Sequence, residues 1–241
     1  SSGRTTAMDV VEAIGNTPLI ELKKVSRGLP NPVFIKCEHL NPGGSVKDRT
    51  ARAIILDAEA RGVLTPGSGQ TIIEGTAGNT GMGLALIAGA RGYRCICVIP
   101  ERVAVDKRVA LRQLGSEVYI AKPGGIKSPD NFRNVAARLA EENGWFATNQ
   151  FHNPANLDAH YGGKGFSATG PEIHTQMRGQ VAAFVSAAGT GGTITGVGRY
   201  RKEQSAGGKS GRADPIGSSL GECVNTGELG PDGPYTVEGI G

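Results

Sequence analysis

The sequence predicts an α/β fold in which mostly parallel sheets are flanked by helices. Short apolar stretches at residues 71–73, 95–99 and 117–120 alternate with helical patterns. Strands that are separated by helices pair in parallel, because each crossover returns the chain to the same end of the sheet. A further apolar stretch at residues 181–185 runs through a glycine-rich turn into a helix, which predicts a second strand-to-helix section with a buried strand.

Two helices are expected to pack against the first sheet. Residues 51–58 carry apolar side chains at helical spacing, and Gly62 is placed to end that helix. The same spacing recurs in residues 132–139, and Gly144 follows as a helix end. The polar, glycine-rich stretch 204–212 predicts a loop.

The composition indicates a globular protein and argues against two classes of partner. Hydrophobic residues make up 38% and charged residues 20% of the 241 positions, which is ordinary for a folded chain. The net charge of +4 is small, and no basic stretch is interleaved with aromatic residues, so nucleic acid binding is not expected. No stretch approaches the roughly 20 apolar residues of a membrane span, so a membrane partner is not expected either.

The cysteines predict a reducing compartment such as the cytoplasm. Cys37, Cys95, Cys97 and Cys223 include no pair with the spacing of a metal or redox site. Cys95 and Cys97 alternate inside an apolar strand, where thiols are usually buried and inert. The histidines are irregularly spaced, so no metal site is expected. Surface or loop positions are predicted for His39, His152, His160 and His174.

Lys47 is the first candidate for chemistry. It lies where a Pro/Gly turn leads into a helix, with Ser45 as a possible cap and Asp48 three residues later completing a capping-box pattern. The positive end of the helix dipole disfavours an ammonium there, and a lowered amine pKa is what a lysine needs to attack an aldehyde. A solvated surface lysine fits the same residues, so this position alone leaves both interpretations open.

A glycine-rich loop near residue 190 is a candidate phosphate site. It follows the strand at 181–185 and precedes a helix, the context in which backbone N–H groups and a helix N-terminus bind phosphate. The loop lacks the lysine of a nucleotide-binding P-loop and the spacing of a dinucleotide fingerprint, which favours a monophosphate. A tight turn that merely needs glycine is the alternative. The loop comprises Gly189, Thr190, Gly191, Gly192 and Thr193.

A second loop occupies the corresponding place after the strand that ends near Glu74. It comprises Thr76, Ala77, Gly78, Asn79, Thr80 and Gly81. Its short hydroxyl and amide side chains suit a substrate carboxylate, and Asn79 can bond a ring substituent of a cofactor. A helix-capping loop without a ligand is the alternative. An imine-forming lysine, a phosphate site and a carboxylate site together describe pyridoxal phosphate holding an amino acid.

These motifs resemble the fold-type II pyridoxal-phosphate enzymes and, within them, the cysteine synthase (O-acetylserine sulfhydrylase) family. The resemblance covers nearly the whole chain and rests on ordered matches at residues 14–19, 41–49, 76–81, 150–151, 169–173, 189–193 and 238–241. It implies a tryptophan synthase β-like fold of two lobes. A smaller substrate-binding lobe would comprise residues 41–148, and a larger cofactor-binding lobe would combine residues 9–40 with 149–241.

The resemblance also implies a role for each site residue. Lys47 would hold pyridoxal 5'-phosphate as an imine and later remove the substrate α-proton. Asn79 would contact the ring oxygen, residues 189–193 would bind the cofactor phosphate, and Gly239 would lie against the cofactor face. The substrate carboxylate would be bound by Thr76, Gly78, Asn79, Thr80 and Gln150.

The implied activity is a β-replacement in which O-acetyl-L-serine gives an aminoacrylate and sulfide adds to make L-cysteine. The sequence Asn79-Thr80 resembles this branch more than the dehydratases, which usually carry histidine after the asparagine. Cystathionine β-synthase, which condenses serine with homocysteine, shares the motifs and is the alternative enzyme. The resemblance suggests a homodimer.

The chain departs from the family pattern in three places. Ala77 stands where the family often has serine. Residues 207–212 lack the apolar strand that the family places before Asp214, so a weak or displaced strand is expected. Family members continue beyond Gly241 and there carry the serine that faces the pyridine nitrogen, so we expect a C-terminally truncated larger lobe. A non-catalytic paralogue that binds cofactor or a partner protein is therefore the third interpretation.

Overall fold

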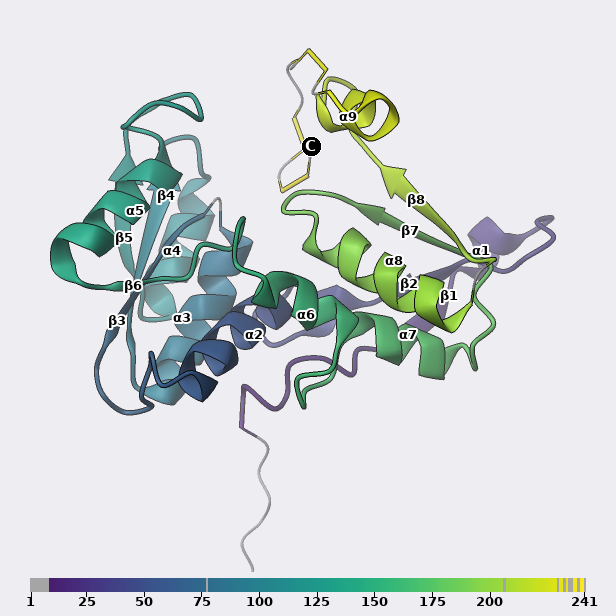
Figure 1. The fold of residues 1–241 in the computed structure, drawn as a ribbon, viewed down its shortest axis with the longest axis horizontal. Coiled ribbons are helices and arrows are strands. Elements are labelled where there is room, and N and C mark those ends of the chain that lie inside the picture. Colours follow the sequence, from purple (N-terminus) through teal and green to yellow (C-terminus); the bar gives the residue numbers. More distant parts are fainter. Residues whose placement is uncertain are drawn as a thin grey trace, which may run out of the picture. The chain divides into compact units, whose positions relative to one another are not determined.

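The computed structural model describes the chain in two compact units, the first ending at Ala155 and the second beginning at Asn156 (Figure 1). The residues it describes are 9–76, 78–205, 207–228, 230–231, 233, 236–237 and 239–240. Among their helices, none is long and apolar enough to cross a membrane.

The first unit is built around a four-stranded parallel sheet of order β5-β4-β3-β6 (Figure 1). Its strands are β3 (Thr71–Gly75), β4 (Arg94–Pro100), β5 (Glu117–Ala121) and β6 (Phe146–Ala147). In register, Ile72 lies opposite Cys95, and Ile96 lies opposite Glu117. The three strands predicted from the apolar stretches, and their parallel pairing, are confirmed.

Helices connect these strands and cover both faces of the sheet. They are α2 (Lys47–Ala60), α3 (Asn79–Arg91), α4 (Val105–Gln113) and α5 (Phe132–Asn143). Successive strand residues point to opposite faces, so Ile72 packs in one cluster with Ile55 and Leu84 of α2 and α3. Its neighbour Ile73 packs in the other cluster with Val135 of α5. The buried thiols of the apolar strand β4 are also confirmed.

The predicted ends of two helices are confirmed by backbone geometry. Gly144 follows α5 with a φ of 65°, the left-handed conformation that glycine adopts at low cost. Gly62 follows α2 with a φ of 70°. The remaining elements of this unit are an antiparallel pair and short turns, namely β1 (Leu19–Glu21), α1 (Lys23–Ser26), β2 (Phe34–Lys36) and the 3-10 turn η1 (Glu38–Leu40).

The second unit is a smaller strand-to-helix section. Its elements are α6 (Ala155–Tyr161), α7 (Thr169–Gln176), β7 (Ala183–Ala187), α8 (Gly192–Gln204), β8 (Lys209–Ala213) and α9 (Leu220–Thr226). β7 and β8 pair in parallel, and α8 is the crossover between them (Figure 1).

Two predictions for this unit were wrong. The stretch 204–212, predicted as a loop, contains most of β8, because pairing with β7 overrides the weak strand propensity of its glycine and lysine residues. The strand predicted at 181–185 begins two residues later, at Ala183. It was expected to be buried, yet Val185 is 65% exposed, since no described residue covers its side chain.

Candidate active site

Lys47 stands at the first position of α2, the helix start predicted for it. The predicted cap needs a correction of one residue, because Val46 occupies the N-cap position. The Ser45 hydroxyl nevertheless accepts a hydrogen bond from the Lys47 backbone N–H at 3.2 Å. Burial lowers the pKa of the Lys47 amine. The expected direction is confirmed, although desolvation rather than the helix dipole is its cause.

Asp48 holds the glycine turn in front of this helix. Its Oδ2 accepts a hydrogen bond from the Gly43 backbone N–H at 2.6 Å. A Cβ at Gly43 would lie 2.5 Å from Oδ1 of Asp48, so this position requires glycine. Oδ1 itself is buried and has no hydrogen-bond partner among the described residues. Burial raises the pKa of Asp48 to about 6, although the Gly43 N–H acts in the opposite direction.

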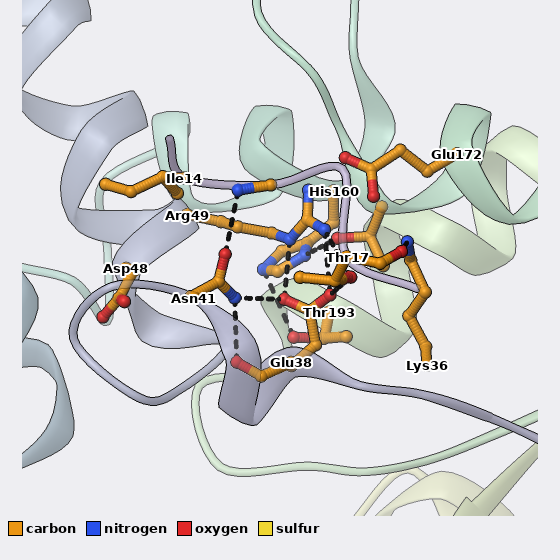
Figure 2. A network of polar contacts seen from close by, with 12 residues as sticks. Ile14, Thr17, Lys36, Glu38, Asn41, Asp48, Arg49, His160, Glu172 and Thr193 are labelled. Carbon is orange, nitrogen blue, oxygen red and sulfur yellow. Dashed lines mark hydrogen bonds and ion pairs between the residues drawn. The ribbon is translucent and has the colours of Figure 1, made fainter. Parts of the chain in front are cut away.

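A buried ion pair fixes the turn of α2 that follows Lys47 (Figure 2). The fully buried Arg49 donates from Nε to Oε2 of Glu38 at 2.7 Å and from Nη2 to Oε1 at 2.8 Å. The Thr17 hydroxyl donates to Oε1 of the same carboxylate at 2.6 Å. Burial alone would raise the pKa of Glu38, but the hydrogen bonds and charge of Arg49 outweigh it and lower that pKa.

Asn41 extends this network to the chain on either side (Figure 2). Its Nδ2 donates to Oε2 of Glu38 at 2.9 Å and to the backbone oxygen of Ser45 at 3.1 Å. Its Oδ1 accepts from the Gly15 backbone N–H at 2.8 Å. The network therefore joins the N-terminal segment, η1 and the start of α2, and it holds the backbone that carries Lys47.

The predicted carboxylate loop lies at the junction between β3 and α3. The Thr76 hydroxyl accepts from the Gly78 backbone N–H at 3.1 Å, and the Thr80 hydroxyl donates to Oε1 of Gln150 at 2.6 Å. Thr76, Thr80 and Gln150 are buried, whereas Asn79 is exposed. Ala77 lies outside the described residues. The structure thus brings Thr80 and Gln150 together from positions 70 residues apart.

Glu74 supports this loop, a role that we did not predict. Its Oε1 accepts from Nε2 of Gln150 at 3.2 Å, and its Oε2 accepts from the Gln150 backbone N–H at 3.2 Å and from the Thr148 hydroxyl. The Gln150 amide therefore turns its nitrogen to Glu74 and its oxygen to Thr80. Burial raises the pKa of Glu74, against the effect of these hydrogen bonds. A carboxylate inside an apolar strand was the available signal, because a buried charge needs partners.

Lys107 of α4 lies beside the same loop. A Cβ built on Gly78 would lie 3.2 Å from Cδ and 4.0 Å from Nζ of Lys107. Gly78 has a φ of 139°, which side chains rarely adopt, so glycine is required there for two reasons. The lysine adds positive charge next to hydroxyl and N–H donors, which favours an anionic ligand.

The predicted phosphate loop lies at the junction between β7 and α8. Gly191 adopts a left-handed conformation with a φ of 81°, which favours glycine. A Cβ at Gly189 would overlap the backbone oxygen of Gly239, so these two predicted site residues lie in direct contact. Because α8 has 13 residues, its N-terminus presents unpaired N–H groups and a helix dipole to a ligand.

Helix α6 supports the threonines of this loop. Nδ2 of Asn156 donates to Oγ1 of Thr190 at 2.8 Å. Nε2 of His160 lies 3.2 Å from Oγ1 of Thr193, a contact that Figure 2 shows. Nδ1 of His160 lies 2.8 Å from Oγ1 of Thr169. The prediction of a surface or loop position was wrong for His160. Its side chain is 1% exposed, because the packing of α6 turns its ring onto these threonines.

The predicted residues form one cluster in each unit, and both clusters fit a phosphorylated aldehyde cofactor. The first unit contains Lys47, whose lowered amine pKa suits imine formation, and the loop around Thr80. The second contains residues 189–193 and Gly239, where a Cβ at Gly189 would overlap the Gly239 backbone and a Cβ at Gly192 would overlap the Asn156 side chain. In the part of the chain that the structure describes, no group of three or more His, Cys, Asp or Glu residues is arranged to hold a metal ion.

Comparisons with known proteins find similarity along nearly the entire chain. A family model described as pyridoxal-phosphate dependent enzyme matches residues 10–240. Cysteine synthase 1 of Emericella nidulans is 44% identical over 236 residues, which are 96% of this chain and 62% of that protein. Cystathionine beta-synthase of Apis mellifera is 44% identical over 238 residues, which are 97% of this chain and 45% of that protein.

A solved structure also matches. The crystal structure of O-ureido-L-serine synthase has a TM-score of 0.83 and 36% sequence identity. The match covers 98% of this chain and 70% of that chain.

Proposed function

We propose that this chain, which belongs to the pyridoxal-phosphate dependent enzyme family, makes L-cysteine from O-acetyl-L-serine and sulfide by β-replacement. The predicted family and its fold-type II α/β architecture are confirmed by the family match and by the TM-score of 0.83. The activity is a proposal because the chain spans 62%, 63% and 60% of three cysteine synthases. The observation that carries the proposal is Lys47 at the start of α2, whose amine has a pKa lowered by burial. It stands in a chain that is 44% identical to a cysteine synthase.

Lys47 supplies the amine that the reaction needs. Because burial lowers its pKa, a larger fraction of the amine is neutral at a given pH than for an exposed lysine. In the proposal, neutral Nζ would hold pyridoxal 5'-phosphate through its aldehyde group, whose oxygen would leave as water. Once the substrate amine displaces it, Nζ would accept the α-proton of the amino acid. The cofactor, when bound, supplies the electron sink for the charge left at the α-carbon.

The two loops bind the two anionic groups. In the proposal, Thr76, Gly78, Asn79, Thr80 and Gln150 surround the substrate carboxylate. Because the Thr80 hydroxyl donates to Gln150 and the Gly78 N–H donates to Thr76, the donors for the carboxylate are the Thr76 hydroxyl and the backbone N–H groups of Asn79 and Thr80. The exposed side chain of Asn79 would bind the ring oxygen of the cofactor. Residues 189–193 and Gly239 would hold the cofactor, with its phosphate at residues 189–193. Both loops begin helices, so backbone N–H groups and the helix dipole add to the binding of each anion.

A cysteine-formation assay with a lysine variant tests this proposal. With O-acetylserine, sulfide and pyridoxal phosphate, the chain should form cysteine, and Lys47→Ala should abolish the reaction because it removes the amine Nζ. Lys24→Ala, which removes an exposed lysine of α1, is the control and should keep the full rate. An unchanged rate in Lys47→Ala would contradict the assignment of this lysine.

Cystathionine β-synthase activity is the second candidate, supported by the 44% identity to the Apis mellifera protein. The same chain should be assayed with serine and homocysteine in parallel. A clear preference for that pair over O-acetylserine and sulfide would replace the first proposal. Attachment of pyridoxal phosphate without turnover of either pair would support the non-catalytic interpretation instead.

We also propose a homodimer that works in a reducing compartment such as the cytoplasm. The four free cysteines support the compartment, because an oxidising one would favour disulfides or exposed thiol damage. The dimer rests on the family resemblance. Light scattering should give twice the 24.9 kDa of one chain, and a monomer mass would contradict it.

A further inference from the structure

We propose that helix α6 directs the hydroxyl protons of Thr190 and Thr193 toward a bound phosphate, with Asn156 and His160 as positioning residues. The inference deepens the proposed function and rests on it, since it assumes that the loop 189–193 binds a phosphate. All the contacts that carry it lie within the second unit.

Close packing of α6 on the start of α8 makes these contacts available. Asn156 and His160 are four residues apart and therefore lie on one face of α6. Gly192 and Gly196 have the same spacing on α8. A Cβ at Gly192 would overlap the Asn156 side chain, and a Cβ at Gly196 would lie 2.7 Å from Cβ of His160. The two glycines thus allow the helices to approach closely enough for side chains of α6 to reach the loop.

The hydrogen bonds of Thr190 leave its proton available to a ligand. A threonine hydroxyl has one proton to donate and two lone pairs that accept. Nδ2 of Asn156 donates to Oγ1 at 2.8 Å, and the Gly192 backbone N–H donates to the same oxygen at 3.4 Å. Both lone pairs are therefore engaged, and the hydroxyl proton is free to point at a phosphate oxygen.

The hydrogen bonds of Thr193 depend on the tautomer of His160. A neutral imidazole has one N–H that donates and one nitrogen that accepts. If Nε2 carries the proton, it donates to Thr193, the Thr169 hydroxyl donates to Nδ1, and the Thr193 proton is free. If Nδ1 carries the proton, it donates to Thr169, and the Thr193 hydroxyl must donate its own hydrogen bond to Nε2.

A bound phosphate selects the first of these arrangements. Its oxygens accept hydrogen bonds strongly, so the state in which Thr193 donates to phosphate is favoured. Thr169 makes that state possible, because its hydroxyl can donate a hydrogen bond to the unprotonated Nδ1, which lies 2.8 Å away. Since His160 and Thr169 are 1% and 2% exposed, bulk water does not take the place of either partner.

A tautomer measurement on the unaltered chain tests the inference directly. The ring nitrogens of His160 are assigned by 15N correlation NMR in the chain with pyridoxal phosphate bound, and in Lys47→Ala with inorganic phosphate. We expect a proton on Nε2 in both complexes, the state that leaves the Thr193 proton free. A proton on Nδ1 with none on Nε2 in the bound state would overturn the proposal.

Isosteric variants give an independent test through phosphate affinity. Asn156→Asp replaces the donor with an acceptor that takes the Thr190 proton, and His160→Phe removes both ring contacts. Each should raise the dissociation constants for pyridoxal phosphate and inorganic phosphate by about tenfold or more. Asn225→Asp and His152→Phe alter exposed residues and should leave both constants within about twofold. Unchanged affinity in Asn156→Asp and His160→Phe would overturn the proposal.

A double variant separates positioning from general damage. If His160 acts through the Thr193 hydroxyl, His160→Phe should weaken binding in the unaltered chain but not in Thr193→Val. Equal losses in both backgrounds would make His160 a purely structural residue and contradict the inference. Failure of the unaltered chain to bind pyridoxal phosphate would contradict the proposed function itself. A proton on Nδ1 with none on Nε2, in a chain that binds the cofactor, contradicts only this inference.

Discussion

The two anion loops of this chain resemble each other in sequence, yet they rest on different supports. The loop after β3 is held by a buried carboxylate, Glu74, which orients Gln150 and through it Thr80. The loop after β7 is held by an amide and an imidazole, those of Asn156 and His160, and not by a carboxylate. A carboxylate beneath a loop opposes a doubly charged phosphate more than a singly charged carboxylate. These supports agree with our proposal that the first loop binds the substrate carboxylate and the second binds the phosphate.

The same contrast extends to Lys47. The helix start that carries it depends on a buried ion pair, whereas the side-chain contacts of the loop 189–193 come from an amide and an imidazole. Because Glu38 and Arg49 neutralise each other, they hold the backbone without adding a net charge that would shift the amine. Changes to buried charges should thus affect stability and pH dependence in the first unit most strongly.

The largest expected effect is the loss of the buried ion pair. Arg49→Met leaves the Glu38 carboxylate without its cation and should lower the free energy of unfolding by about 3–5 kcal/mol. Urea denaturation measures this. Arg61→Met is the matched control, since Arg61 pairs with Asp57 on the surface at 2.8 Å and its loss should cost less than about 1 kcal/mol. Equal losses of unfolding free energy in Arg49→Met and Arg61→Met would contradict the expectation that the buried ion pair matters more than the exposed one.

Asp48→Asn should change the pH dependence of stability. The folded-state pKa of Asp48, about 6, lies above the unfolded value of 3.8, so the folded chain binds more protons between these pH values. Stability due to this group therefore falls as the pH rises through that window, by roughly 3 kcal/mol. Asparagine keeps the acceptor for the Gly43 N–H and carries no charge.

Urea denaturation at pH 4 and pH 7 tests this expectation. The free energy of unfolding should fall less from pH 4 to pH 7 in Asp48→Asn than in the unaltered chain, and the difference should be roughly 3 kcal/mol. Asp130→Asn, at an exposed position, serves as the control and should leave the decline as it is. An identical decline in Asp48→Asn would contradict the account of this carboxylate.

Glu74→Gln distinguishes the two loops by their ligands. The change disturbs the orientation of Gln150 and Thr80, so KM for the amino acid should rise about tenfold. Affinity for pyridoxal phosphate should stay within about twofold, the opposite pattern to Asn156→Asp. Steady-state kinetics and cofactor titration measure the two effects, with exposed Glu141→Gln as the control. A parallel loss of cofactor affinity would show that the loops do not act separately.

The smallest effect is expected at Lys107. Lys107→Met removes a half-buried positive charge beside Gly78 and should raise KM for the amino acid by about two- to threefold. The difference should shrink at high salt, because salt screens charges near the surface. A salt-independent change would indicate lost packing instead.

Local sequence patterns were sufficient to place the candidate residues but not their supports. Lys47, Thr80 and the loop 189–193 were located from turn residues, apolar strands and helix starts, all of which act over a few positions. The supports join residues that are distant in sequence, such as Thr17 and Arg49, 32 positions apart. Asn156 and Thr190 are 34 positions apart. No periodicity within one helix or strand predicts such pairs.

Strands that carry apolar side chains could be predicted from the sequence, and a strand without them could not. β3 and β4 carry buried apolar side chains, and β5 is also rich in apolar residues although most of it is exposed, so their sequences reveal all three strands. β8 does not, because its residues Lys209–Ala213 join the sheet through backbone pairing with β7. His160 was misplaced because burial of a histidine depends on partners that only the packed helices provide.

The site of cofactor attachment tests the central claim most directly. The chain is incubated with pyridoxal phosphate, reduced with borohydride, digested and mapped by mass spectrometry. The account predicts one added pyridoxyl group, on the peptide that contains Lys47. Attachment at another lysine, or none, would contradict it.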